Sequence, residues 1–222
     1  MKLARITLVA ALLALAPLQA GANPPVIVEF PLDVHTWRIV PSESGKVDYY
    51  NVVQDPSLPY IHARYVPPYE TAVLGVEIPE VERPRARKLR WTWRAITLPN
   101  GGDECASGKG DSAAVIYVVW RRGLRSYALK YVWSAVGRKG QTQCDRKRSP
   151  FVAQDTIILE SGGPLNTWVN EEIDLKTEFR NHFENGDQNA DVPDLRGVAL
   201  MTDGDQTASE SSADYAGFKL LR

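Results

Sequence analysis

The residues best suited to ligand chemistry lie in the segment Met201-Thr202-Asp203-Gly204-Asp205-Gln206-Thr207. The spacing Asp-x-Asp-x-Thr places alternate oxygen atoms on one side of a tight loop, and hard cations such as Ca²⁺ prefer oxygen ligands. Asp203, Asp205 and Thr207 are therefore candidate ligands for a structural calcium ion, although no cofactor is required. The same residues also suit a plain turn whose side chains bond their own backbone. Asp111, in a second acidic loop, is a further candidate ligand-binding residue.

Tryptophan is the second candidate ligand-binding residue type, because an exposed indole can stack on the C–H face of a sugar ring. Of the six tryptophans, three lie near the ends of expected strands and are candidates for such a platform: Trp37, Trp120 and Trp168. The other three alternate with polar residues or occupy a strongly aromatic strand, which predicts burial in the core: Trp91, Trp93 and Trp133.

Several catalytic motifs are excluded. The Gly-rich segment from Gly102 to Gly110 has five residues where a phosphate-binding loop needs four, and the sequence contains no His-Glu-x-x-His and no Gly-x-Ser-x-Gly. The three histidines, His35, His62 and His182, are far apart and read as structural or surface residues. No nucleic-acid-binding module is recognisable, so nucleic acid is not an expected partner.

The elements that must position these residues are short strands rich in Val, Ile, Tyr, Trp and Thr, separated by Pro, Gly, Asn and Asp clusters. About eleven such strands predict an all-β fold, an antiparallel two-sheet β-sandwich. One helix is expected near 174–185, where Leu175, Phe179 and Phe183 recur every four residues after a capping Asp174. The expected strands are Val26 to Phe30, Val47 to Val53, Tyr60 to Val66, Thr71 to Ile78, Lys88 to Leu98, Ala113 to Trp120, Arg125 to Trp133, Asp155 to Glu160, Trp168 to Ile173, Gly197 to Thr202 and Tyr215 to Leu221.

The two cysteines, Cys105 and Cys144, are expected to form a disulfide. The strands on either side of Arg121-Arg122-Gly123-Leu124 form an expected hairpin. Partners in such a hairpin have residue numbers with a constant sum of about 247 here, and the cysteine numbers sum to 249. The alternative is a pair of free buried thiols.

The first 22 residues have the pattern of a secretory signal peptide: Lys2 and Arg5 precede an apolar run that ends in Ala20-Gly21-Ala22. We therefore expect a single mature domain over 23–222 that is periplasmic or secreted, the compartment in which disulfides form. No later apolar run approaches the ~18 residues of a membrane span, so no transmembrane segment is expected in the mature chain.

Charge is unevenly distributed, although 26 bases nearly balance 27 acids over the 222 residues. The segment from Arg121 to Arg148 has nine basic and one acidic residue, whereas Glu184 to Asp214 has eight acidic and one basic residue. This pattern predicts either a bipolar surface that attracts a partner or solvated loop faces. With 44% hydrophobic residues, the composition excludes a disordered or collagen-like chain.

Four motifs resemble, in order, the bacterial family called domain of unknown function 3047: Leu89-Arg90-Trp91-Thr92-Trp93-Arg94-Ala95, Gly110-Asp111-Ser112-Ala113-Ala114, Tyr131-Val132-Trp133 and the segment from Met201 to Thr207. Ser112 stands where that family usually has a second acid, so the sequence departs from the family pattern there. The resemblance implies export and a jelly-roll sandwich similar to galactose-binding and carbohydrate-binding modules, with no established activity.

These observations predict an exported, non-catalytic binding protein for a carbohydrate of the cell envelope or the environment. One alternative is a hydrolase or lyase acting on a polysaccharide, with Asp111, Asp203 or Asp205 as acid, base or metal ligand. The other is a protein-interaction module that uses the charge asymmetry.

Overall fold

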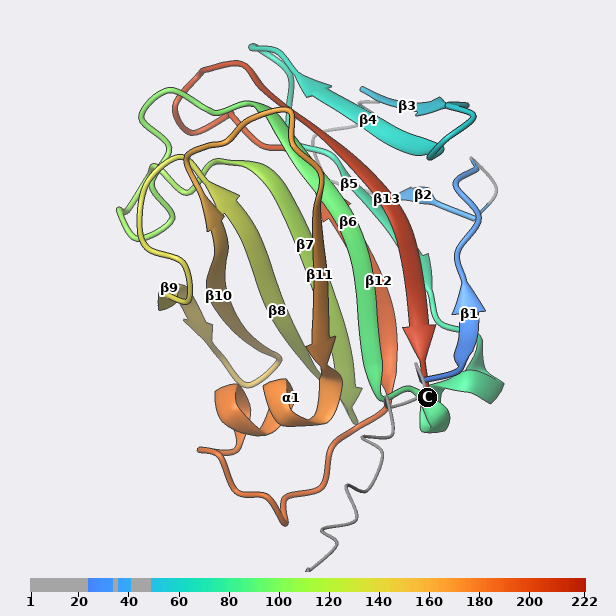
Figure 1. Ribbon diagram of the computed structural model, residues 1–222. Coiled ribbons are helices and arrows are strands. Elements are labelled where there is room, and N and C mark those ends of the chain that lie inside the picture. The colour runs from blue at the N-terminus through green and yellow to red at the C-terminus, as the bar shows by residue number, and fades with distance from the viewer. Residues whose placement is uncertain (1–23, 34–35, 41–48) are drawn as a thin grey trace, which may run out of the picture.

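The computed structural model describes residues 24–33, 36–40 and 49–222. The expected signal peptide, the beginning of the expected strand at Val47, and His35 lie outside these ranges. Within them no helix is long and apolar enough to cross a membrane. The described elements (Figure 1) are β1 Val26–Glu29, β2 Arg38–Val40, β3 Tyr50–Val53, β4 Tyr60–Tyr65, β5 Val73–Glu77, the 3₁₀ helix η1 Glu80–Arg85, β6 Lys88–Thr97, β7 Ser112–Arg122, β8 Arg125–Ser134, β9 Thr142–Arg148, β10 Val152–Ser161, β11 Val169–Asp174, α1 Leu175–Phe183, β12 Leu195–Met201 and β13 Ser211–Leu221.

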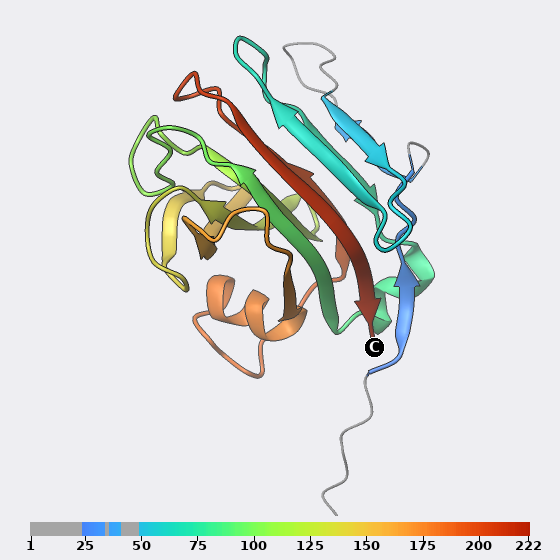
Figure 2. The same cartoon turned by 45° about the horizontal axis from the view of Figure 1, so that its top comes forward.

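The strands form two sheets that pack face to face, as the sequence predicted. Sheet I has the order β11-β6-β13-β4-β3, with β1 also paired to β13, and sheet II has the order β2-β5-β12-β7-β8-β10-β9. From β4 to β7 the chain alternates between the sheets, and it returns through β11, β12 and β13 so that β4 pairs with β13, β5 with β12 and β6 with β11. A long hairpin rolled over in this way is a jelly roll. Figure 2 shows β13 between β6 and β4 along the length of sheet I.

Sheet II departs from the predicted antiparallel pattern at one place. β10 runs parallel to β8, from Val152 beside Ser126 to Ser161 beside Ser134, and β9 then pairs antiparallel with β10 at the sheet edge. The sequence did not predict β2 or β9. The β9 sequence Thr-Gln-Cys-Asp-Arg-Lys-Arg is polar apart from Cys144, and Gln143 and Asp145 have positive φ, so it lacks the alternation that marks a half-buried strand.

The core between the sheets is aromatic, and its residues follow the predicted alternation. Trp91 and Trp93 on β6 are fully buried and lie edge to face, with ring centroids 5.7 Å apart. Trp93 also contacts Trp133 of β8, at 6.0 Å, and Trp91 contacts Tyr131, at 5.9 Å. Close packing of these rings joins the two sheets, so the assignment of these three tryptophans to the core is confirmed.

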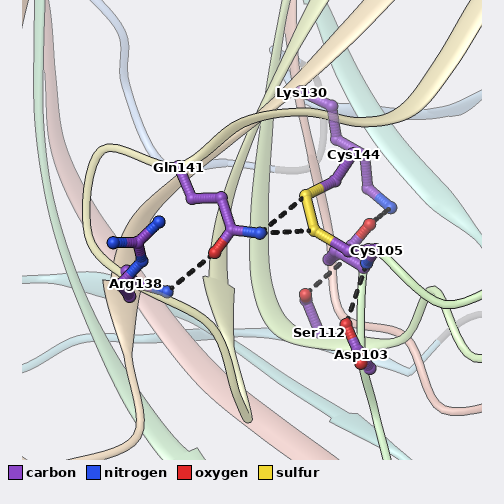
Figure 3. The surroundings of a disulfide bond; sticks show 8 residues. Asp103, Cys105, Ser112, Lys130, Arg138, Gln141 and Cys144 are labelled. Carbon is purple, nitrogen blue, oxygen red and sulfur yellow. Dashed lines mark hydrogen bonds and ion pairs between the residues drawn. A yellow bond between two sulfur atoms is a disulfide. The ribbon is translucent and has the colours of Figure 1, made fainter.

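A loop over residues 98–111 covers part of the outer face of sheet II. Cys105 in this loop forms the predicted disulfide with Cys144 of β9, and Gln141 Nε2 lies beside both sulfur atoms (Figure 3). The constant sum of residue numbers in the β7–β8 hairpin predicted the correct pair of cysteines. The hairpin itself does not bring them together, however, because β10 lies between β8 and β9, the strand that carries Cys144. Beneath the loop, Lys130 Nζ lies 2.8 Å from Glu104 Oε2, and both residues are buried. The disulfide therefore fixes this loop over the outer face of the β7–β8 hairpin.

The helix α1 lies below the ends of β8, β10 and β11 (Figure 1). Asp174 caps it as predicted, accepting a hydrogen bond from Thr177 N at 2.8 Å. Phe179 is buried and contacts Trp120 and Tyr127, at 5.5 and 5.1 Å. The apolar stripe of the helix thus closes this end of the core.

Candidate functional site

Two loops at one end of the sandwich bring together the acidic residues singled out from the sequence. Asp111 immediately precedes β7, and Asp203 and Asp205 follow β12. Oxygen atoms of the three carboxyl groups lie within 4.8 Å of one another, and the first two side chains are buried while Asp205 is exposed. We call these three residues the acidic cluster. The convergence of the two loops, which the sequence alone left open, is a result of the fold.

Hydroxyl and amide donors hold the cluster. Thr71 Oγ1 lies 2.7 Å from Asp203 Oδ1 and 2.8 Å from Asp205 Oδ2. Asp111 Oδ2 accepts hydrogen bonds from Thr207 N and Thr207 Oγ1, at 2.7 and 2.6 Å. Thr207, predicted to face a cation directly, therefore reaches the cluster through Asp111. Thr71 was not predicted, because it lies more than 100 positions earlier in the chain and carries no motif.

Burial and mutual repulsion set the protonation of the cluster. The pKa of Asp203 is raised to about 7, first by burial and then by the charges of Asp205 and Asp111, against the lowering effects of the Thr71 hydrogen bond and Lys130. At neutral pH the cluster would gain from a bound proton or from a cation. Three carboxylates with an exposed member have the oxygen chemistry of a calcium site, so calcium binding stays a prediction.

Gly204 is essential to the loop that carries two of these acids. A Cβ atom at this position would lie 2.1 Å from Ser209 O and 2.8 Å from Tyr65 Cδ1. Only glycine therefore permits the close approach of the loop to β4.

The three tryptophans assigned to a sugar platform have different environments. Trp37 and Trp120 are 2% and 1% exposed, so their assignment to a platform is wrong. Trp120 lies at the inward parity of β7, and Trp37 packs on Phe218 with ring centroids 4.8 Å apart. Position near a strand end did not predict exposure, because Phe179 of α1 packs on Trp120 and Phe30 and Phe218 pack on Trp37.

Trp168 is half-buried and lies on the outer face of sheet I. Its indole is edge to face with Tyr60 of β4, with centroids 5.7 Å apart, and Arg94 Cζ lies 4.4 Å from the indole centroid. The strand register continues this group across the sheet, from Arg94 to Asp214 of β13 and from Asp214 to His62 of β4. We call these five residues the aromatic–polar row.

Asp214 fixes the polar half of this row. It is 2% exposed, and it accepts from Arg94 Nε at 2.7 Å and lies 2.6 Å from His62 Nδ1. A buried carboxylate that holds a guanidinium and an imidazole gives both groups a defined orientation before any ligand arrives. The side chains of Arg94 and His62 remain 24% and 32% exposed.

Sequence reasoning missed four of these five residues. The alternation along β6 predicted a polar face opposite the tryptophans, and Arg94 lies on that face. His62 and Asp214 lie 152 positions apart, so only the pairing of β4 with β13 brings them together.

A family model described as "Protein of unknown function (DUF3047)" matches residues 35–219. The chain belongs to this family. No curated protein matches this DUF3047 chain.

Among solved structures, the DUF3047 chain is similar to the family 11 carbohydrate-binding module of the cellulosomal cellulase Lic26A-Cel5E of Clostridium thermocellum. The TM-score is 0.47 at 8% identity, over 91% of this chain and 96% of that one. It is also similar to the xyloglucanase domain of NopAA from Sinorhizobium fredii, with a TM-score of 0.45 at 10% identity, over 86% and 96% of the two chains. Trichoderma harzianum endoglucanase 3, of family GH12, gives a TM-score of 0.42 at 10% identity, over 78% and 82%. These likenesses concern the fold alone.

Proposed function

We propose that this protein is an exported, non-catalytic carbohydrate-binding protein and that its sugar site is the aromatic–polar row on the outer face of sheet I. The observation that carries the proposal is the position of Trp168. Trp168 is the one tryptophan of six that is not buried, and it lies beside Tyr60 and a fixed set of hydrogen-bonding side chains.

The row contains the two kinds of group that a sugar ring requires. Arg94 Cζ lies over the rings of Tyr60 and Trp168, 5.4 and 4.4 Å from their centroids, and the ring surface that Arg94 leaves uncovered is apolar and suits the C–H face of a pyranose. Arg94 offers N–H groups and His62 offers its second ring nitrogen to sugar hydroxyls, and both side chains are oriented by Asp214. Because these groups are already ordered, binding loses little side-chain entropy.

Binding to oligosaccharides tests the proposal, and intrinsic fluorescence gives a direct readout. The other five tryptophans are at most 2% exposed, so quenching by acrylamide reports mainly on Trp168. A bound oligosaccharide should protect this signal. On a glycan array, Trp168→Ala should weaken binding at least about tenfold, the effect of losing roughly 1.4 kcal/mol.

Phe151→Ala is the matched control, since Phe151 is 61% exposed in the β9–β10 turn and belongs to another surface. It should bind glycans as the wild type does. Equal losses in the two variants, or a wild type that binds no glycan, would refute the proposed site.

A polysaccharide-acting enzyme is the second candidate, and the acidic cluster favours it. Glycoside hydrolysis uses a pair of carboxyl groups. This cluster contains three carboxyl groups at one end of the sandwich, with one oxygen atom of each within 4.8 Å of the others. Under this alternative, Asp205→Asn abolishes release of reducing ends from a polysaccharide while Trp168→Ala reduces it through binding. If the wild type releases no reducing ends from any polysaccharide that it binds, the enzyme alternative is refuted and the non-catalytic function is retained.

A further inference from the structure

The outer face of sheet II is hollowed into a trough over β2, β5, β12 and β7, with a volume of about 1330 Å³. Strand register explains the hollow. Gly75 of β5 lies between Arg38 of β2 and Ala199 of β12, and Gly197 of β12 lies between Glu77 and Val119 in the next row. Because Gly75, Gly197 and Ala199 have no side chain or only a methyl group, the surface over β5 and β12 is lower than the surface over the flanking strands β2 and β7.

The floor is close-packed in spite of its small residues. A Cβ atom at Gly197 would lie 3.0 Å from Val76 O, and one at Gly75 would lie 3.1 Å from Val40 Cγ2. Ala199 is only 9% exposed. The trough is therefore a fixed feature of the sheet.

The rim is basic. Four arginines line the trough, Arg38, Arg83, Arg121 and Arg196, against the single carboxylate of Glu77. Two of them are oriented by the backbone: Arg83 Nε donates to Ile78 O at 2.9 Å and Arg121 Nε to Gly123 O at 3.0 Å. The whole chain has a net charge of −1, so this positive field is local to the trough.

The chemistry of the rim suits oxyanions. All four basic side chains that line the trough are arginine rather than lysine, and the planar guanidinium fork matches the paired oxygens of a carboxylate or a phosphate with two parallel hydrogen bonds. The volume exceeds the roughly 300–1,000 Å³ of pockets for drug-sized ligands, which suits an extended chain. No aromatic side chain lines the trough in the part of the chain that the structure describes, so it lacks the stacking groups with which proteins bind single-stranded nucleic acid.

We propose that this trough binds an acidic polysaccharide, a chain of uronic acid residues whose carboxylates pair with Arg83, Arg121 and Arg196. The site is separate from the aromatic–polar row, because the two lie on different sheets and each occupies the outer face. It is also separate from the part of sheet II that the disulfide-held loop covers. This inference goes beyond the proposed function and does not depend on it.

The experiment measures binding of polygalacturonate oligomers to the full chain by calorimetry, with fully methyl-esterified oligomers as the uncharged counterpart. The wild type should bind the acidic form at least about tenfold more tightly, as expected for loss of charge-assisted hydrogen bonds. Added salt should weaken binding of the acidic form, since salt screens the charges. Equal binding of the two forms, or no binding of the acidic form, would overturn the proposal.

Two kinds of variant locate the site. The double variant Arg121→Gln, Arg196→Gln should lose at least about tenfold in affinity, while Arg64→Gln, Arg90→Gln, which removes the same charge from sheet I, should bind as the wild type does. Ala199→Leu raises the floor without changing charge and should also weaken binding, with thermal unfolding used to verify that the variant is folded.

Three outcomes contradict the proposal: equal losses in the two arginine double variants, unchanged binding in folded Ala199→Leu, and equally tight, competing binding of a single-stranded oligonucleotide. The first would mean general charge attraction, and the last a different class of ligand. Trp168→Ala should leave this binding unchanged, so failure here is distinguishable from failure of the proposed sugar site.

Discussion

Replacing Lys130 with methionine is expected to destabilise the protein by about 3–5 kcal/mol, the usual result of breaking a buried ion pair from one side. Lys130 and Glu104 are 4% and 2% exposed, and their side chains meet at 2.8 Å. Burial alone would lower the pKa of Lys130, but Tyr117 and Glu104 raise it above its ordinary value, so the side chain stays charged. Without the ammonium group, Glu104 keeps the hydrogen bond from Ser112 Oγ, at 2.7 Å, but becomes an uncompensated charge under the loop.

Thermal unfolding followed by circular dichroism measures this loss as a fall in Tm on the order of 10 °C, from about 2–4 °C per kcal/mol for a chain of this size. Adding Glu104→Gln removes the stranded charge, so the double variant should recover most of the stability. Lys147→Met is the control, because Lys147 is 58% exposed and its ion pair with Asp145 lies at the surface; it should cost less than about 1 kcal/mol. A double variant as unstable as Lys130→Met, or an equal effect of Lys147→Met, would refute the reasoning.

Four further predictions follow from the core, the disulfide and the acidic groups. Trp93→Ala should cost about 3–5 kcal/mol in urea unfolding, as for other large core aromatics; a stable variant would contradict the packing of Trp93 on Trp133. Reduction of the disulfide should cost roughly 3–4 kcal/mol, the value for a loop of 39 residues, and mass spectrometry of unreduced protein should find no alkylatable thiol. Burial and the charge of Glu160 raise the pKa of Glu171 to about 7, above that of the unfolded chain. Glu171 should therefore contribute a fall in stability of about 1–2 kcal/mol as pH rises from 4.5 to 7, after allowance for partial exposure. Glu171→Gln should remove this part of the slope and leave the part due to Asp203, whose pKa is also raised to about 7. Calcium should raise the Tm of the wild type and EDTA should lower it, because an ion that binds the folded state stabilises it. Neither reagent should change the Tm of the double variant Asp203→Asn, Asp205→Asn. If neither changes the Tm of the wild type, the prediction of a calcium site is wrong.

The sequence predicted best where one residue type repeats at a fixed spacing. The alternation from Leu89 to Ala95 identified the buried face of β6, and the spacing of Leu175 and Phe179 identified α1 with its cap. In both elements the buried face repeats within a single strand or helix, so local spacing was enough.

Prediction failed where burial depends on a segment far away in the chain. Lys130 reads as an outward-facing residue of β8, and it is outward-facing, yet the loop from 98 to 111 closes over it. Trp120 reads as a strand-end residue and is buried by α1. The aromatic–polar row and the trough depend on strand order, which no local pattern encodes.

The placement of β13 has a consequence for how this chain folds. β13 is the last strand, and it lies in the interior of sheet I, between β6 and β4. Its partners in β4 are about 150 positions earlier, as with His62 and Asp214 at 152. Closing such distant pairs is slow, and β4 and β6 cannot bridge one another until residues 211–221 have emerged from the ribosome. A nascent chain that stops short of β13 would expose two unpaired strand edges, so completion of sheet I is expected to be a late step in folding.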